Sequence, residues 1–367
     1  GNVTLTGSAF GDYIDGGSGN DILAGGDGVD TLIGGTGADT LMGGNGDDTL
    51  LIDGSDASIA GGAGFDSVFV QDVATVVTLD MGAASIEWAQ GNAGGDTFNA
   101  ASQSARVYIY GMGGNDTLTG SAFGDFIDGG EGGDSLAGGD GIDTLIGGNG
   151  DDTLNGGDGV DVLIGGAGAD TMIGGNGDDT LLVDNADLSI TGAAGFDSLF
   201  VTSDTGVTLD LAVASIEWAQ GSVLGGDTLN ASGNAANTFL YGWGGADRLM
   251  GGSGDDYIAG GADNDILGGG AGNDTMIGEG GVDRYLYTAA TWGSDTIHSF
   301  DTNGEKLDFT AVAGIDSFSD FTTFEWDPGS LGFNSTTLFY TDGGTTSAIT
   351  LIGVQVASLS DSDFLFV

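Results

Sequence analysis

Apolar residues recur at intervals of nine along three stretches of this chain. Between Gly138 and Leu182 the sequence reads GGDGIDTLI GGNGDDTLN GGDGVDVLI GGAGADTMI GGNGDDTLL, with Gly first, Asp sixth and an aliphatic residue or Met eighth in each block. Blocks in the same phase fill residues 7–51, 111–182 and 242–286, and position 8 is apolar in every one. One register kept over three separated arrays indicates a structural repeat.

Each block divides into a turn and a short strand. The half GGxGxD favours a turn, because Gly adopts positive φ at low cost and lets backbones approach closely. The other half has one inward apolar residue, flanked by residues of good strand propensity. Two blocks make one flattened coil, turn–strand–turn–strand, whose strands stack in parallel, with position 8 filling the space between two sheets. We therefore predict an all-β protein, a parallel β-roll or β-helix solenoid.

Two spacers of equal length separate the arrays. Residues 52–110 and 183–241 each contain AGFDS, ASIEWAQG and GGDT. The distance in sequence between a segment and its later copy is two blocks longer for these segments than for the segment at the start of the chain. This difference corresponds to one inserted coil. Runs such as Val68–Val70 and Val76–Leu79 predict strands, so we expect the spacers to continue the stack with fewer metal sites. For Trp88 and Trp218, packing against the core is favoured over a surface anchor.

The composition changes after about residue 287, where Gly thins and Phe becomes frequent. We expect residues 287–367 to cap the stack, because an open stack exposes an edge that must be covered. The six expected segments are 1–51, 52–110, 111–182, 183–241, 242–286 and 287–367, which alternate arrays and spacers and end in this cap. The chain begins inside a repeat, so we expect residue 1 not to be the native beginning.

The charge is extreme for a chain with this much apolar sequence. There are 55 acidic residues against four Lys plus Arg, for a formal net charge of −51, while 40% of the residues are hydrophobic. The apolar content predicts a folded core rather than disorder. Nucleic acids and anionic membranes are excluded as partners, since both are bound through Lys and Arg. No run is long and apolar enough to span a membrane, and the absence of Cys removes disulfides and thiolate metal sites.

Metal cations remain as the natural partner. Stacked coils lie about 4.8 Å apart, so the sixth-position Asp residues form columns of like charge that repel unless a cation lies between successive turns. Carboxylate and carbonyl oxygens are hard ligands that suit Ca²⁺. The predicted ligands are Asp12, Asp21, Asp30, Asp39, Asp48, Asp116, Asp125, Asp134, Asp143, Asp152, Asp161, Asp170, Asp179, Asp247, Asp256, Asp265, Asp274 and Asp283.

The nonapeptide GGxGxDxUx resembles the calcium-binding repeat of RTX proteins, secreted bacterial proteins that fold as parallel β-rolls. The resemblance implies one Ca²⁺ between turns two blocks apart, held by Asp carboxylates and turn carbonyls. Each array has about two fewer such pairs of turns than it has blocks, so the three arrays predict about a dozen ions in all. Sites near Phe10, Phe123 and Asp263, which replace the fourth-position Gly, are in doubt. The end of the chain, Asp363 followed by Phe364, Leu365, Phe366 and Val367, resembles a type I secretion signal.

No catalytic constellation is present in the sequence. The single His, His298, cannot form a zinc or paired-His centre, and there is no nucleophile elbow or P-loop. Paired acids such as Asp151 and Asp152 fall at repeat positions 5 and 6, where turns and metal binding explain them better than glycosidase chemistry. Strand propensity likewise explains the Thr residues before position 8 better than an ice-binding or glycan-binding ladder. We therefore expect no enzyme activity.

Two classes of function remain. The first is a secreted structural protein that folds on export in extracellular calcium and self-associates at or outside the cell surface, as a surface-layer, matrix or filament subunit. The second is the calcium-folded carrier and secretion module of a larger exoprotein, such as a serralysin-like protease, lipase or adhesin. The expected partners are calcium ions, further copies of the chain and the type I secretion machinery, and the expected location is extracellular.

Overall fold

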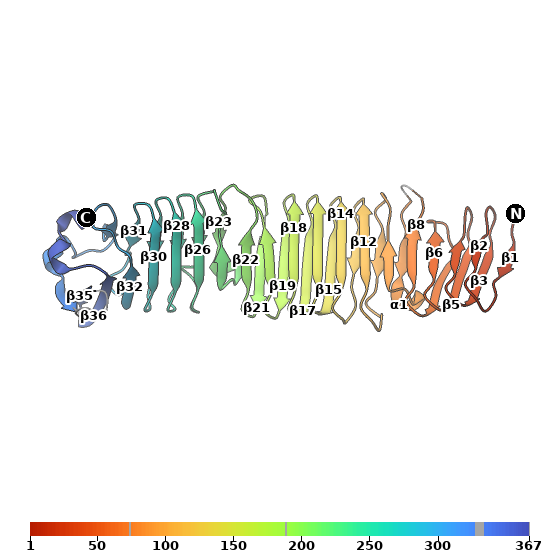
Figure 1. Ribbon diagram of the computed structural model, residues 1–367, viewed down its shortest axis with the longest axis horizontal. Helices are drawn as coiled ribbons and strands as arrows, with labels where there is room; N and C mark the ends of the chain where they lie inside the picture. The colour runs from red at the N-terminus through yellow and green to blue at the C-terminus, as the bar shows by residue number, and fades with distance from the viewer. Residues whose placement is uncertain (73–74, 188, 327–333, 367) are drawn as a thin grey trace. The chain divides into compact units, whose positions relative to one another are not determined.

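The chain folds into two compact units of stacked parallel strands. The computed structural model describes residues 1–72, 75–187, 189–326 and 334–366. Unit 1 contains residues 1–182 and 186–195, and unit 2 contains residues 183–185 and 196–367. In each unit the chain winds through successive coils, so that neighbouring strands in space come from successive coils in sequence (Figure 1). The predicted all-β parallel solenoid is confirmed.

Unit 1 has three parallel sheets. The strands of sheet 1 are β1 (Thr4–Thr6), β3 (Ile22–Asp27), β5 (Thr40–Asn45) and β7 (Ser58–Ala63). The strands of sheet 2 are β2 (Tyr13–Asp15), β4 (Thr31–Ile33), β6 (Thr49–Ile52), β8 (Ser67–Val70), β10 (Trp88–Gln90), β12 (Tyr108–Gly113), β14 (Phe126–Glu131), β16 (Thr144–Asn149), β18 (Val162–Ala167) and β20 (Thr180–Val183). The strands of sheet 3 are β9 (Thr78–Asp80), β11 (Thr97–Asn99), β13 (Thr117–Thr119), β15 (Ser135–Gly141), β17 (Thr153–Gly159), β19 (Thr171–Asn176) and β21 (Ser189–Ala194).

The core of each coil is one apolar side chain per strand. In the arrays a strand pairs with the strand two blocks further on, so Leu136, Leu154 and Met172 lie one above the other. Each of these residues is buried, while the residues on either side of it are more exposed. The alternation follows from the two-residue period of a strand. Position 8 of the repeat therefore builds a thin core that exists only when coils stack.

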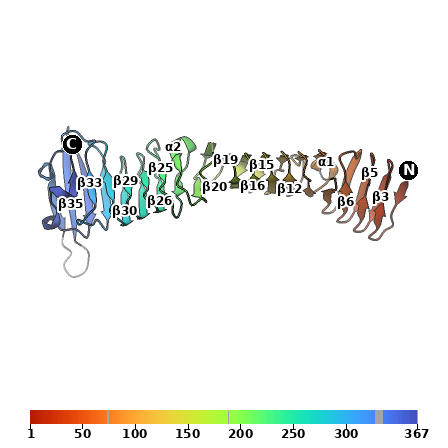
Figure 2. The ribbon, with the colours of Figure 1, turned by 90° about the horizontal axis from the view of Figure 1, so that it is seen from above.

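The first spacer continues this stack with longer coils. Val68 and Ala89 pair in neighbouring strands and both point inward, although the coil that separates them is longer than two blocks. This longer coil contains the one-turn helix α1 (Met81–Ala84), capped by Asp80 (Figure 2). The predicted strand Val68–Val70 lies within β8, whereas strand β9 begins at Thr78 rather than Val76.

Unit 2 repeats this organisation with two sheets. The strands of sheet 4 are β22 (Ser198–Val201), β24 (Trp218–Gln220), β26 (Phe239–Gly244), β28 (Tyr257–Ala262), β30 (Thr275–Gly280), β32 (Ser294–His298), β36 (Thr345–Ile352), β35 (Ser335–Asp342) and β34 (Thr322–Trp326). The strands of sheet 5 are β23 (Thr208–Asp210), β25 (Thr228–Asn230), β27 (Arg248–Met250), β29 (Ile266–Gly268), β31 (Arg284–Leu286), β33 (Lys306–Asp308) and β37 (Phe364–Leu365). Helix α2 (Leu211–Ala214), capped by Asp210, is the counterpart of α1.

The C-terminal region caps unit 2, as the sequence predicts. Strand β36 pairs in parallel with β32, and β34, β35 and β36 then pair in antiparallel order. Aromatic rings fill the interior here, with Phe309 stacked on Tyr287 at 5.0 Å between ring centroids and Trp292 stacked on Tyr340 at 5.9 Å. Short 3-10 turns lie at Phe318–Asp320, Val356–Ser358 and Asp361–Asp363. Val367, the last residue of the expected secretion signal, lies outside the described residues.

The two spacer tryptophans lie on the outer face of the sheets, so their expected packing against the core is wrong. In β10 the inward position is taken by Ala89, and Trp88 stands in an outward row with Phe69, Tyr110 and Phe126. Trp218 has the same place in unit 2. Because side chains alternate along a strand, a buried Ala89 requires Trp88 to face outward. Within the described residues, neither helix is long and apolar enough to cross a membrane.

Candidate metal sites

The acids of successive coils are joined into columns through the backbone. One carboxylate oxygen, Oδ1, of each Asp accepts a hydrogen bond from the amide of the residue one coil earlier. The amide of Asp30 donates to Asp48 at 2.8 Å, and that of Asp143 donates to Asp161 at 2.8 Å. The stacking of coils therefore fixes the position of every carboxylate in a column.

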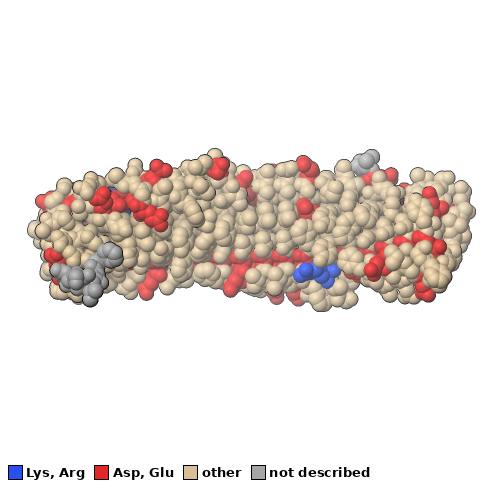
Figure 3. Space-filling model, in the orientation of Figure 1, with Lys and Arg blue, Asp and Glu red and all other residues tan. Residues whose placement is uncertain are grey.

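All eighteen predicted ligands lie in such columns. Those of unit 1 are Asp12–Asp30–Asp48–Asp66–Glu87, Asp21–Asp39–Asp56, Asp96–Asp116–Asp134–Asp152–Asp170–Asp187 and Asp125–Asp143–Asp161–Asp179. Those of unit 2 are Asp197–Glu217, Asp227–Asp247–Asp265–Asp283 and Asp256–Asp274–Asp295. Figure 3 shows acidic atoms gathered in rows on one face of the molecule.

The second carboxylate oxygen, Oδ2, has no hydrogen-bond partner at most of these positions. This holds for the buried Oδ2 atoms of Asp21, Asp30, Asp39, Asp48, Asp116, Asp134, Asp143, Asp152, Asp161, Asp247, Asp265, Asp274 and Asp283. A buried anionic oxygen without a partner is strongly destabilising. The repetition of the same unpaired atom in coil after coil indicates that a ligand outside the chain completes these turns.

At the first Gly of the repeat, a backbone carbonyl oxygen of the next coil lies close to the free Oδ2 atom. A Cβ added to Gly16 would lie 2.6 Å from Oδ2 of Asp21 and 2.8 Å from the carbonyl oxygen of Gly34 in the next coil. The first position therefore has no room for a side chain. The second and fourth glycines have positive φ, as at Gly26 (115°) and Gly28 (126°), which curls the turn around these oxygens.

The donor set of these turns fits calcium. It consists of carboxylate and carbonyl oxygens, the hard ligands that Ca²⁺ takes in numbers of six to eight, and consecutive turns of one column supply both kinds. No three acidic side chains converge in the described part of the chain, so backbone carbonyls must provide much of the coordination. Ca²⁺ would lie between successive turns and be held by the Asp side chains and the turn carbonyls.

In three of the predicted ligands Oδ2 is not free, because it accepts a hydrogen bond from an amide of the same turn. Oδ2 of Asp12, Asp125 and Asp256 accepts a hydrogen bond from the second-position amide of Ser8, Ser121 and Gly252, respectively. In these turns the second and fourth residues lack positive φ. The first two contain Phe10 and Phe123, whereas the third, GGSGDD, has the usual sequence. The fourth-position substitution Asp263 keeps a φ of 77° and leaves Oδ2 of Asp265 free.

The position of a turn within its column explains most of these exceptions. Asp125 and Asp256 each begin a column, because the residues that donate amides to them are Val107 and Thr238 rather than acids. A cation between two turns needs an acid on both, so a first acid is better satisfied by its own amide. The spacer acids Asp96 and Asp227 follow the same rule. Asp21 also begins a column but keeps the usual turn.

Sequence reasoning missed several acids that continue the columns through the spacers. Asp66 extends the column of Asp48, and Glu87 follows it by accepting from the amide of Asp66 at 2.9 Å. Asp295 extends the column of Asp274 in the C-terminal region. A signal for Asp66 was available, since Gly61–Phe69 reads GGAGFDSVF and matches the repeat in register. Glu87 carried no such signal, because its coil is longer than a repeat pair.

Burial and like charge make the columns hard to ionise without a cation. Burial raises the pKa of Asp116 to about 7 and that of Asp247 to about 8, and neighbouring carboxylates in the same columns add to both increases. Burial and the neighbouring carboxylates likewise raise the pKa of Asp143 and of Asp265 to about 7. At neutral pH these carboxyl groups therefore favour either a proton or a metal cation.

Comparisons with known proteins agree with this arrangement. The family described as RTX calcium-binding nonapeptide repeat (4 copies) matches residues 4–32, 25–51, 110–145, 146–181, 225–258 and 251–285. These matches cover the three arrays almost completely, extend into the second spacer from residue 225, and together include about half of the chain. No curated protein sequence matches the chain.

Sixteen chains of solved structures show similarity to this chain. One is the AlgE6R3 subunit of the Azotobacter vinelandii mannuronan C5-epimerase, with 24% identity over 48% of this chain and 82% of that one, and a TM-score of 0.19. Another is the extracellular lipase LipA from Serratia marcescens, with 19% identity over 72% of this chain and a TM-score of 0.17. This chain spans only 40% of the lipase. At these scores neither comparison bears on substrate or activity.

Replacing one column acid should remove calcium only where Oδ2 is free. We expect Asp143→Asn to lower the number of bound calcium ions by about one or two, because the ions above and below share its carboxylate. Asp125→Asn is the matched control in the same column and should leave the number unchanged. Native mass spectrometry of the calcium-loaded protein counts the ions. Equal losses in the two variants, or no loss in Asp143→Asn, would contradict this assignment.

Calcium-free protein should be more stable at low pH. The folded-state pKa values of about 6 to 8 at Asp152, Asp116 and Asp247 lie above the value of about 4 in an unfolded chain. The protonated carboxyl groups therefore stabilise the metal-free fold fully below about pH 4, and this stabilisation is lost as the pH rises through about 8. Circular dichroism of metal-stripped protein between about pH 3 and pH 8 measures this change, with a β-sheet signal expected at the acid end and its loss towards neutral pH. Calcium-saturated protein should show the opposite change, because protons compete with calcium. A metal-free stability that rises over this range would refute the explanation.

Proposed function

Because its three arrays make the chain a member of the RTX calcium-binding repeat proteins, we propose that it is an exported protein whose fold forms only when calcium occupies the carboxylate columns. The observation that carries this proposal is the unpaired Oδ2 atom that recurs in most of the columns, as at Asp30, Asp143 and Asp265. Taking one carboxylate out of water without a counter-charge costs several kcal/mol. Thirteen such atoms in one chain exceed what a folded domain can tolerate, since its net stability is only about 5–15 kcal/mol.

The extracellular space is the compartment that supplies the necessary calcium. Extracellular calcium modules bind their ions at about 10⁻⁴ to 10⁻³ M, well above what the interior of a cell provides. Repulsion within a chain of net charge −51 keeps the polypeptide extended until calcium is bound. An unfolded chain suits export by a type I secretion machinery, and folding outside would then be one-way. The C-terminal residues would serve first as the secretion signal and then as the cap.

We further propose that the folded protein is a structural subunit without enzymatic activity, which associates with further copies of itself. Among the described residues, strands β1 and β2 of unit 1 each pair on one side only, with β3 and β4, so each has an edge that a further strand, from this polypeptide or from another copy, can extend. Beside this edge Phe10 and Tyr13 are 79% and 70% exposed. Bound calcium would also reduce the repulsion between copies, so that folding and assembly have the same trigger.

The same edge supports a second candidate role, the carrier module of a larger exoprotein. A strand from elsewhere in the same polypeptide can extend an open edge as readily as a strand from another copy. In unit 2, by contrast, β34, β35 and β36 cover the end of the stack. Under this alternative the stack would fold and deliver an attached active part.

Calcium should control folding. In metal-free buffer at neutral pH we expect an unfolded spectrum by circular dichroism, and in about 1–10 mM calcium a β-sheet spectrum. The same concentrations of magnesium should not substitute, because Mg²⁺ gives up its water reluctantly. A cooperative unfolding transition in metal-free protein at neutral pH would refute calcium-dependent folding.

Assembly should depend on the open edge of unit 1. Calcium-loaded protein should form large particles by light scattering and ordered sheets or filaments by electron microscopy, which a chelator dissolves. The double variant Phe10→Asp with Tyr13→Asp should remain monomeric, because it adds charge beside the edge. Val213→Asp, at a site 79% exposed in α2, is the matched control and should still assemble. A folded monomer at every calcium concentration would exclude the structural role and leave the carrier role.

A further inference from the structure

Two bulky residues of unit 2 occupy turn positions at which most repeats have Gly. The second position of the repeat has a positive φ, as at Gly26. In unit 2 this position holds Trp243 with a φ of 71° and Glu279 with a φ of 69°. Residues with large side chains seldom adopt this conformation, because Cβ approaches the backbone. Strain of this kind is often retained at functional positions.

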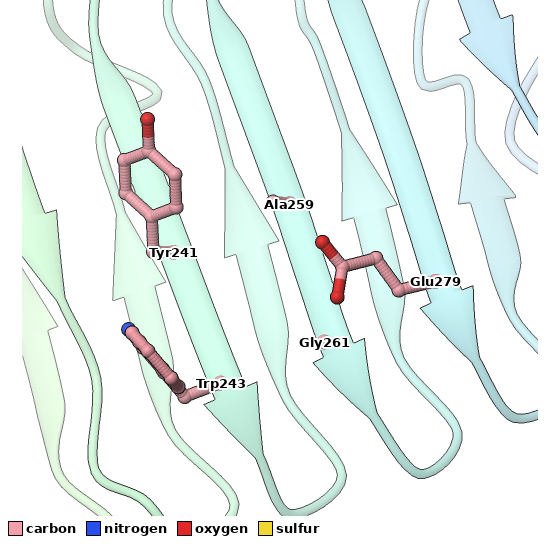
Figure 4. Close-up of a pocket in the computed structure, with 5 residues that line it drawn as sticks. All are labelled: Tyr241, Trp243, Ala259, Gly261 and Glu279. Carbon is pink, nitrogen blue, oxygen red and sulfur yellow. The ribbon is translucent and has the colours of Figure 1, made fainter.

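The two strained residues face the same small hollow. Trp243 in β26 pairs with Gly261 in β28, which in turn pairs with Glu279 in β30. Gly261 has no side chain, so a cavity of about 140 Å³ opens between them, lined by Tyr241, Trp243, Ala259, Gly261 and Glu279. Figure 4 shows the phenol and indole on one side, the Glu279 carboxylate on the other, and Ala259 and Gly261 as the floor.

The hollow is rich in electrons and has no cation of its own. The faces of Tyr and Trp rings carry partial negative charge, and Glu279 adds a full one. The three basic residues of unit 2 lie in sheet 5, on strands β27, β31 and β33, rather than in the sheet of Trp243. Trp243 is 55% exposed, so a ligand can reach the ring from solvent. A positively charged ligand would relieve the repulsion between the rings and the carboxylate.

We propose that Tyr241, Trp243 and Glu279 form a binding site for a quaternary ammonium group. Such a cation gains cation–π attraction from the two rings and charge attraction from the carboxylate. Its methyl groups pack on aromatic carbon, whereas a hydrated metal ion would gain little from ring faces that offer no lone pairs. The net charge of −51 also draws cations towards the surface. This site is separate from the carboxylate columns and does not depend on the proposed structural role.

Unit 1 provides an internal comparison. The matching strand β12 has Tyr110 and Met112 in place of Tyr241 and Trp243, and Met112 also has a positive φ of 76°. Met112 pairs with Gly130, which pairs with Gly148 at the place of Glu279. Unit 1 therefore lacks both the indole and the carboxylate at the matching positions. We expect one site per chain.

Calorimetric titration of calcium-saturated protein with choline tests the proposal. We expect one saturable site, and the neutral isostere 3,3-dimethylbutan-1-ol should bind at least about tenfold more weakly because it has no charge. Trp243→Gly and Glu279→Gly should each weaken choline binding by at least about tenfold. Both variants restore the Gly of the repeat and relieve a strained φ, so neither should lower the melting temperature. Met112→Gly in unit 1 is the matched control and should leave binding unchanged.

Two further measurements separate related explanations. Co-sedimentation with phosphatidylcholine vesicles distinguishes a lipid headgroup from free choline as the ligand, and either source supports the site. Calcium counting in Glu279→Gln should match the unaltered protein. The proposal is overturned if choline shows no saturable binding, if the neutral isostere binds equally well, if Met112→Gly weakens binding as much as Trp243→Gly, or if Glu279→Gln loses a calcium ion.

Discussion

The stacking of like-charged carboxylates is the constraint on which the rest of this structure depends. Each coil places its acid beside the acid of the coil below and ties it there by a hydrogen bond from the backbone amide, as between Asp143 and Asp161. The same geometry that aligns the strands thus also concentrates negative charge in buried turns. Because folding and charge concentration are one event, calcium bound between the turns would offset the cost of bringing these carboxylates together.

The glycines and the thin core follow from this constraint. A turn that surrounds a cation with its own carbonyls must curl tightly, which requires positive φ at the second and fourth positions and no side chain at the first. The rest of each repeat leaves room for a single inward side chain, such as Leu145 or Leu163, both fully buried. A core this thin stabilises a coil only through its neighbours, so stability is a property of the stack.

The spacers show how much variation this stack accepts. Coils longer than two blocks keep their inward side chains in register, because the extra residues lie in the loops between strands and in the one-turn helices α1 and α2. The outer faces then become free to carry rows of aromatic rings, such as Phe200, Trp218, Tyr241 and Tyr257 in unit 2. The hollow beside Trp243 lies next to this row. Tyr241 belongs to both, and the second-position residues Trp243 and Glu279 complete the lining.

The sequence by itself determined the period, the inward position of residues such as Leu136, the parallel stacking and the acid at each turn, because these depend only on residues within one repeat. The tertiary structure alone decided which carboxylates keep a free oxygen. Asp256 lies in a turn of ordinary sequence, yet its oxygen is satisfied because Thr238, not an acid, lies in the coil below. It also decided that Trp88 faces outward and that Trp243 and Glu279, two coils apart, share one hollow. Both outcomes depend on what the neighbouring coil presents, and inserted residues in the spacers change which residue that is.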